Sequence, residues 1–254
     1  MADAASVRSF ASAVSQTTSL PRHPAIVRIT HWITTGCFLA LLVSGAEIVI
    51  SHPRFYWGET GNVFTPALFK LPIPASRASV PTGYGFVLPD QNGWSRDLHF
   101  EAAWIIVFTG LLYTISGVVT RHFRRQLLPA DVDLNWAALS RVLADHMRIR
   151  RPGAAEAGSY NVLQRVTYLF VIFVLFPLMI WTGFAMSPAV VSAFPGIVTV
   201  LGGHQSARTI HFFASVFLVM FLVGHIVMVC RAGFKNRTLA MLTGRVAATP
   251  KEGP

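Results

Sequence analysis

Four long apolar stretches run through this chain, and they restrict what it can fold into. They cover about residues 29–50, 98–120, 162–186 and 208–230. Each is long enough for a helix to cross the hydrocarbon core of a bilayer, which takes about 20 residues. Lipid offers no hydrogen-bonding partner to backbone amides, so such segments satisfy those groups by forming helices. The sequence therefore predicts an all-α membrane protein, a bundle of four transmembrane helices.

The remaining residues divide around this bundle. Residues 22–245 form the predicted transmembrane domain, and only 13% of all residues are charged, about half the share usual in soluble domains. Residues 1–21 have no apolar segment typical of a removable signal peptide, so we expect a disordered tail there. We expect residues 246–254 to form a flexible C-terminal tail.

Arginine and lysine are unevenly shared between the connecting segments. If both termini lie in the cytoplasm, the outer segments hold few of these residues: Arg54, Lys70, Arg77, Arg96 and Arg208. The positive-inside rule therefore predicts cytoplasmic termini, in a bacterial inner membrane. The net charge of +10 then reflects this topology and attraction to anionic lipid, not nucleic-acid binding.

Two histidines lie fourteen residues apart in the last apolar stretch, His211 and His225. At about 100° per residue they point to nearly the same side of a helix, about 21 Å apart along its axis. Ionisable residues inside a membrane usually have a function. Two imidazoles near opposite ends of a membrane helix suit two haem irons stacked across the bilayer. No CxxCH motif occurs, so covalently attached haem is not expected.

Each iron needs a second axial ligand, and the predicted topology supplies one. His31 begins the first apolar stretch on the cytoplasmic side, at the depth of His225. His99 begins the second stretch on the outer side, at the depth of His211. We therefore predict two iron sites: His31 with His225 on the cytoplasmic side, and His99 with His211 on the periplasmic side.

An arginine precedes three of the four histidines by three residues: Arg28, Arg96 and Arg208. Residues i and i+3 share a helix face, and each arginine lies one turn nearer the water. A guanidinium at that place can bind a haem propionate through two hydrogen bonds. The alternative is that these arginines simply mark the ends of membrane helices, which leaves the constant spacing unexplained.

Other segments carry expectations about structure. Pro177 should kink the third apolar helix. The outer loop 51–96 is too long for a simple connection and should fold over the outer face or dock a partner. His204, in the second outer loop, should be a solvated residue rather than a ligand. Residues 133–150 should form an amphipathic helix on the cytoplasmic surface.

The motifs around the histidines resemble a known family. They read RITHW, RDLHF, ARTIHF and GHIVM. Over residues 22–245 the chain resembles the di-haem membrane cytochrome b subunits of bacterial respiratory oxidoreductases. That superfamily includes the cytochrome b subunits of nickel–iron hydrogenase, formate dehydrogenase and thiosulfate reductase, and bacterial cytochrome b561. The stretch SYNVLQRVTYLFVIFVLFPLMIWTGFAMSP and the run GGHQSARTIHF look closest to the thiosulfate-reductase type, whose members are often paired with molybdopterin oxidoreductases.

The resemblance implies two b haems and an exchangeable quinone. It implies a subunit that passes electrons across the inner membrane between the quinone pool and a periplasmic oxidoreductase, with a molybdopterin enzyme as the expected partner. One local feature adds to this: Asn161, Gln164 and Tyr168 can line one helix face near His31 and His225. They could hydrogen-bond a quinone, or Asn161 could cap the helix and Gln164 could lie among lipid headgroups.

Two other functions stay open at this point. A stand-alone quinol oxidoreductase of the cytochrome b561 type would pass electrons to a diffusible acceptor, and shorter loops than 51–96 would be typical of it. A structural membrane anchor without haem would need no histidines matched in depth. Such an anchor would show no Soret absorbance after purification.

Overall fold

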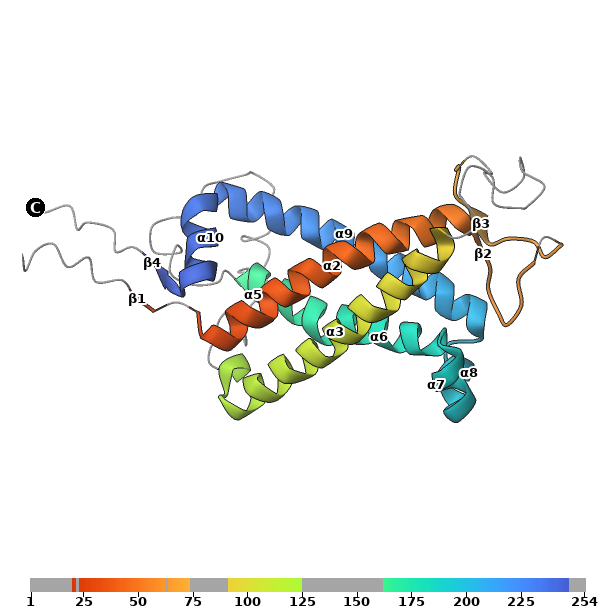
Figure 1. The fold of residues 1–254 in the computed structure, drawn as a ribbon, viewed down its shortest axis with the longest axis horizontal. Helices are drawn as coiled ribbons and strands as arrows, with labels where there is room; N and C mark the ends of the chain where they lie inside the picture. The colour runs from red at the N-terminus through yellow and green to blue at the C-terminus, as the bar shows by residue number, and fades with distance from the viewer. Residues whose placement is uncertain (1–19, 22, 63, 74–90, 125–161, 247–254) are drawn as a thin grey trace, which may run out of the picture.

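The protein is mostly helical, and the computed structural model describes residues 20–21, 23–62, 64–73, 91–124 and 162–246 (Figure 1). Four helical segments in these ranges are long and apolar enough to cross a membrane. They are α2 (Ala25–Ser51), α3 (Gln91–Val119), the run from α5 (Val162–Phe170) through η4 (Val171–Leu175) to α6 (Phe176–Ala185), and α9 (His204–Arg231). The predicted fold class, a four-helix membrane bundle, is therefore confirmed.

Three of these helices, α2, α3 and α9, begin several residues before the apolar stretches do. For α9 the reason is visible in the hydrogen bonds of its first turn. The Gly58 carbonyl accepts from the backbone N–H groups of Gln205 and Ser206, at 3.0 and 3.2 Å. Such first-turn amides have no partner inside their own helix. Because the first turn of α9 depends on a segment distant in the sequence, the local hydropathy does not reveal where this helix begins.

The third span is not a continuous α-helix. Residues Val171–Leu175 form a π-helical turn, and Pro177 follows it at the start of α6. Proline has no N–H to donate, and its ring needs room beside the preceding turn. The wider π-turn, in which the Phe176 N–H donates to the Val171 carbonyl, provides that room. The irregularity expected at Pro177 therefore lies in the turn just before it.

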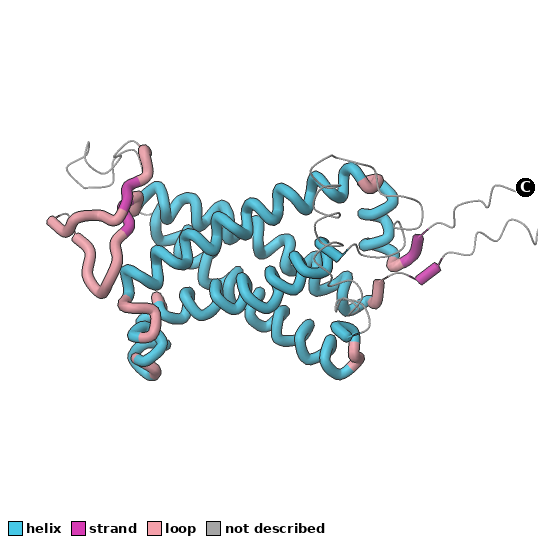
Figure 2. Tube along the Cα trace, turned by 180° about the vertical axis from the view of Figure 1, so that it is seen from behind, coloured by secondary structure: helices cyan, strands magenta, loops and turns pink. Residues whose placement is uncertain are grey.

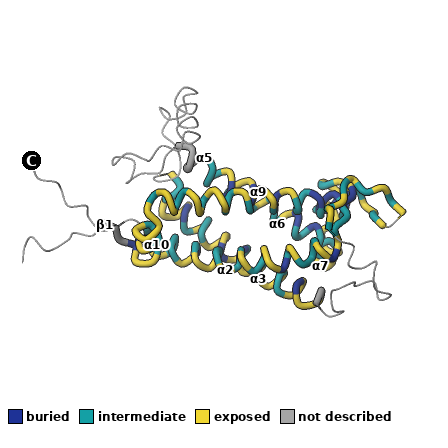
Figure 3. The backbone as a smooth tube through the Cα atoms, turned by 90° about the horizontal axis from the view of Figure 1, so that it is seen from above, coloured by how far each residue is buried: buried dark blue, intermediate teal, exposed yellow. Residues whose placement is uncertain are grey.

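The four spans form two layers. α2 lies along α3, and α6 lies along α9, while few close backbone contacts join one pair of helices to the other. Figure 3 shows α2 and α3 on one side and α6 and α9 on the other. Between the layers, Val171, Leu175 and Leu218 form a buried cluster against which Phe38 of α2 packs. Large apolar side chains on the outside are exposed, as expected for surfaces that face lipid tails.

One end of the bundle, here called the loop end, is where α2 ends and α9 begins. It holds an antiparallel pair of short strands, β2 (Arg54–Phe55) and β3 (Phe69–Lys70), and two short helices, α7 (Pro188–Ala193) and α8 (Gly196–Thr199). Phe55 is 2% exposed and stacks on Phe69, with ring centroids 4.7 Å apart. Phe55 also contacts Phe212 of α9 at 4.4 Å. The described part of the predicted outer loop thus packs against α9. Figure 2 shows this loop and its paired strands, in pink and magenta, gathered at one end of the bundle.

The opposite end, here called the tail end, holds both ends of the described chain (Figure 1). Here α9 is followed by α10 (Phe234–Thr243), and β4 (Arg245–Val246) pairs with β1 (Leu20–Pro21) just before α2 begins. Trp32 Nε1 donates to the Met241 carbonyl at 3.3 Å, which fastens α10 to α2. An even number of spans brings both ends of the described chain to one side of the bundle.

Several sequence expectations lie outside the described residues. They concern the tail up to residue 19, the amphipathic helix expected over 133–150, Asn161 and the tail 247–254. The backbone of Gln164 belongs to α5, but its side chain is also outside the described part.

Candidate functional site

Four histidines lie between the two layers, in two pairs. His31 of α2 lies beside His225 of α9, with ring centroids 6.4 Å apart and ring planes at 50°. His99 of α3 lies beside His211 of α9, at 6.3 Å and 57°. The first pair is at the tail end and the second at the loop end. Because α9 supplies one histidine to each pair, both pairs join the layer of α2 and α3 to the layer of α6 and α9.

These separations fit a metal ion held between two imidazoles. A metal–nitrogen bond is about 2.0 Å and a ring nitrogen lies about 1.1 Å from its centroid, so centroids on opposite sides of one metal are roughly 6.2 Å apart. Among the described residues, no group of three or more His, Cys, Asp and Glu could hold a metal. A metal at either pair would therefore take its other ligands from a bound group, as iron does in a porphyrin.

Buried hydroxyl groups hydrogen-bond the two histidines of the loop end. Ser44 Oγ lies 3.0 Å from His99 Nδ1, and Thr182 Oγ1 lies 2.8 Å from His211 Nδ1. Ser44 and Thr182 are both 0% exposed. Each hydroxyl comes from the neighbouring helix in the same layer, α2 for His99 and α6 for His211. One nitrogen of each ring is thereby occupied, which leaves Nε2 for a metal.

Sequence reasoning missed Ser44 and Thr182. Each precedes a glycine inside an apolar helix, but so does Thr35, whose hydroxyl donates to the backbone carbonyl of His31 at 2.8 Å and not to a ring. A hydroxyl followed by glycine is therefore a weak signal. The packing of α2 on α3 and of α6 on α9 singles out the two that matter.

Aromatic rings surround the tail-end pair. The His225 ring contacts Phe221 at 5.8 Å and Tyr168 at 6.3 Å, measured between centroids. His31 meets Trp32 edge to face at 5.3 Å. His31 Nδ1 is buried and has no hydrogen-bond partner among the described residues. The two histidine pairs therefore differ in what lies behind their rings.

Two of the three arginines with the repeated spacing contact backbone carbonyls. Arg28 Nη1 donates to the Leu242 carbonyl at 2.6 Å, and Arg208 Nη2 donates to the His52 carbonyl at 2.5 Å. Arg28 Nε is buried and has no partner within the described residues. Arg96 is exposed. A propionate at these arginines would add to the carbonyl contacts or replace them.

Three more buried polar atoms at the loop end, Glu47 Oε1, Arg54 Nε and Gln205 Oε1, form no hydrogen bond with the described part of the chain. Burying a polar atom without a partner is costly, so these atoms are candidates for binding a further polar group. Glu47 is also detectable from sequence, because acidic residues inside apolar spans are rare and usually functional.

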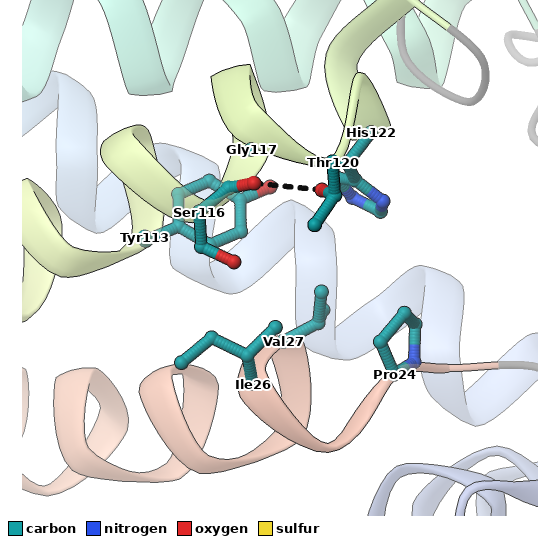
Figure 4. A pocket seen from close by; sticks show the side chains of 8 residues that line it. All are labelled: Pro24, Ile26, Val27, Tyr113, Ser116, Gly117, Thr120 and His122. Atoms are coloured by element: carbon teal, nitrogen blue, oxygen red, sulfur yellow. Dashed lines mark hydrogen bonds between the residues drawn. The ribbon is translucent and has the colours of Figure 1, made fainter.

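His204 and His122 lie apart from the two pairs. His204 bonds the Ala185 carbonyl through Nδ1 at 3.1 Å, and its Nε2 lies 3.4 Å from Glu59 Oε1. His122 lines a small pocket between the start of α2 and the end of α3 (Figure 4). Burial lowers the pKa of His122. None of the four paired histidines lines this pocket.

The chain also resembles known proteins over most of its length. The family model described as prokaryotic cytochrome b561 matches residues 22–244, which include all four paired histidines. A candidate protein-methionine-sulfoxide reductase subunit, YedZ1, from Azospira oryzae is 26% identical over 230 residues, covering 87% of this chain and 96% of that protein. A candidate Ni/Fe-hydrogenase B-type cytochrome subunit from Cupriavidus necator is 24% identical over 230 residues, covering 87% of this chain and 83% of that protein.

Proposed function

Because the chain belongs to the prokaryotic cytochrome b561 family of membrane electron-transfer proteins with b-type haem, we propose that it binds two b haems. In this proposal it carries electrons across the bacterial inner membrane, between the quinone pool and a periplasmic redox enzyme. The observation that carries the proposal is the presence of two histidine pairs at opposite ends of α9.

The paired histidines would be the axial ligands of the two haems. His31 and His225 would hold the tail-end haem, and His99 and His211 the loop-end haem. Since a helix rises about 1.5 Å per residue, His211 and His225 are roughly 21 Å apart along α9. Two sites at that spacing would let an electron cross a hydrocarbon core of about 30 Å in several short transfers.

A bound b haem supplies a centre that accepts and donates one electron at a time. In each site the two imidazoles would hold it. Leu218 lies halfway between His211 and His225 and is 3% exposed. With Val171 and Leu175 it forms an apolar layer between the two sites. Such a layer limits the access of water, which helps to set the redox potential.

We propose that arginines hold the haem propionates. Arg28 would serve the tail-end haem, and its buried, unpaired Nε supports this role. Arg96 and Arg208 would serve the loop-end haem, as their spacing from His99 and His211 suggests. Arg54 joins them as a candidate, because its Nε is also buried without a partner among the described residues.

We propose that quinone reacts near the tail-end haem, on the cytoplasmic side. The support is Tyr168, whose ring centroid lies 6.3 Å from that of His225. Gln164 lies on the same helix, α5, one turn earlier, and Asn161 comes three residues before it. Hydroxyl and amide groups can donate hydrogen bonds to quinone carbonyls, and this set would lie beside the histidine pair.

The redox partner is proposed to dock at the loop end. That end faces the periplasm if both termini are cytoplasmic, as the arginine and lysine distribution indicates. Trp57, Phe64 and Leu68 are 59%, 92% and 58% exposed there, which gives apolar surface for docking. The two relatives carry the names of a methionine-sulfoxide reductase subunit and a hydrogenase subunit, which supports a redox enzyme as partner. A molybdopterin oxidoreductase is the specific partner we propose.

Haem content tests the proposal. The purified wild-type protein should contain two non-covalent b haems per chain, measured as the pyridine haemochrome. His99→Ala and His211→Ala should each lose the loop-end haem alone and halve the yield. His204→Ala is a matched control, because His204 belongs to α9 but to neither pair. Fewer than two haems in the wild type, or both haems unchanged in His211→Ala, would contradict the assignment.

A further inference from the structure

The hydroxyl groups behind the loop-end histidines have their own protons engaged elsewhere. Ser44 Oγ lies 2.8 Å from the Ala40 carbonyl, and Thr182 Oγ1 lies 2.7 Å from the Leu178 carbonyl. Both carbonyls belong to the residue four positions earlier in the same helix. A carbonyl oxygen can only accept, so each hydroxyl donates its single proton there. What each hydroxyl offers the adjacent histidine is a lone pair.

This hydrogen bonding assigns the protons on the two rings. His99 Nδ1, 3.0 Å from Ser44 Oγ, is the donor in that bond, and His211 Nδ1 is the donor to Thr182 Oγ1 at 2.8 Å. The backbone of Met179 is a further hydrogen-bond partner of the His211 ring. A neutral imidazole has one N–H, so Nε2 of each ring keeps the lone pair that a metal needs. The protein backbone and two hydroxyls thus select the metal-binding tautomer of both rings.

We infer that Ser44 and Thr182 are positioning residues of the loop-end haem, acting through His99 and His211; this rests on the proposed function. They set the orientation and the tautomer of each ring. A hydroxyl is a weaker hydrogen-bond acceptor than a carboxylate, so it leaves the Nδ1 proton on each ring and the ring stays a neutral imidazole. At the tail end, His31 Nδ1 is buried without a hydrogen-bond partner among the described residues, so that ring has no such support.

This difference has a redox consequence. A ligand whose N–H donates a hydrogen bond gives more electron density to its iron, which stabilises the ferric state. Removal of the acceptor weakens this donation, so the midpoint potential of the loop-end haem should rise. The unsupported ring can also turn, so that haem should dissociate faster. The tail-end haem should keep its potential, because neither hydroxyl contacts its ligands.

The test uses the full-length, haem-loaded protein with Thr182→Val, which nearly keeps the shape of the side chain and removes the acceptor, and with Ser44→Ala. Redox titration and EPR of the ferric state resolve the two haems, and the pyridine haemochrome gives their number. We expect one midpoint potential to rise and the ferric signal of that haem to shift, while the other haem matches the wild type. Thr182→Ser restores the hydroxyl, so the midpoint potential and the ferric signal should both return to the wild-type values.

Thr114→Val is the matched control. The Thr114 hydroxyl also donates to the carbonyl four residues earlier, 2.8 Å from the Gly110 oxygen, and contacts no histidine in the described structure. This variant should leave both haems unchanged. Loss of the loop-end haem alone in Thr182→Val, restored in Thr182→Ser, also supports the inference.

Three results would overturn the inference. The first is unchanged potentials and ferric signals in both Thr182→Val and Ser44→Ala with full haem content. The second is an equal change in Thr114→Val, and the third is loss of both haems without rescue by Thr182→Ser. A wild-type protein with fewer than two haems would instead overturn the proposed function, so the two failures are distinguishable.

Discussion

At the scale of single residues, the surroundings of the two histidine pairs are unequal. At the loop end a buried hydroxyl bonds each ring, which directs the ring through one hydrogen bond. At the tail end Phe221 and Tyr168 border the His225 ring and restrict it through ring contacts. Hydrogen bonding and the polarity around a haem both change its potential. The two proposed haems are therefore expected to have different midpoint potentials.

Charge near each site leads to a prediction about the arginines. Arg208→Gln should lower the midpoint potential of the loop-end haem, and Arg28→Gln should lower that of the tail-end haem. Each change removes a cation, and a nearby cation disfavours the more positive ferric state. Redox titration of both variants checks this, and each serves as the control for the other. Equal shifts of both haems in either variant would contradict the propionate assignments.

The closeness of the paired histidines could be predicted from two things together: the spacing of two of them within one helix, and the direction of each span, which matches their depths. A regular helix fixes how far apart His211 and His225 lie and which way they point. Ser44 and Thr182 could not be predicted, because their roles depend on which helices pack side by side. Arg28 shows the same limit: its bond to the Leu242 carbonyl depends on how α10 folds back on α2.

At the scale of elements, the start of α9 is built jointly with the loop end. Besides accepting two backbone bonds from α9, Gly58 donates its own N–H to Ser206 Oγ at 2.8 Å. Thr209 Oγ1 donates to the Tyr56 carbonyl at 2.7 Å. Gly203 precedes the helix with φ of 113°, a conformation that suits glycine. The loop and α9 therefore form one structural unit beside the His99–His211 pair.

Gly203→Ala should destabilise this unit. A Cβ on Gly203 would lie 2.5 Å from the Gly58 carbonyl carbon, which is backbone and cannot rotate away. The positive φ adds strain of about 1–3 kcal/mol for a residue with a side chain. We expect a lower Tm in detergent and more rapid amide exchange in the segment around Gly58. Gly196→Ala is the control, because a Cβ there meets nothing within 4 Å. Equal Tm values for the two variants would contradict this account.

The third span shows what a sequence pattern can say about an irregular element. Pro177 predicts an interruption, because it cannot donate a hydrogen bond within the helix. The pattern does not say how the helix absorbs the interruption. In the structure the chain does so with a π-turn over Val171–Leu175, which also supplies two buried residues of the apolar cluster at Leu218.

At the scale of the whole molecule, the four spans were predictable from length and apolarity, but their arrangement in two layers was not. Apolar side chains on the lipid-facing and the inward-facing sides of these helices are chemically alike, so amphipathic patterning gives little guidance. The histidines provide the missing information. Since α9 shares one pair with α2 and the other with α3, the pairs connect the two layers.

Membrane orientation can be tested with reporter fusions. A green fluorescent protein after Pro254 should fluoresce, because both termini are expected in the cytoplasm. An alkaline phosphatase inserted at Phe64, which is 92% exposed at the loop end, should be active because that end is expected in the periplasm. An inactive phosphatase at Phe64 together with an active one at the C-terminus would reverse the assignment. Haem content of each fusion should match that of the unfused protein.

The placement of one histidine for each site on α9 limits how this protein can evolve. A single inserted or deleted residue between His211 and His225 would turn one ring by about 100° relative to the other. No movement of a neighbouring helix could restore both sites at once, because both sites take a histidine from α9. A substitution in the interval leaves the spacing of the two histidines unchanged, whereas an insertion or deletion changes it. Lineages that keep both sites should therefore vary freely in their loops and keep this interval constant.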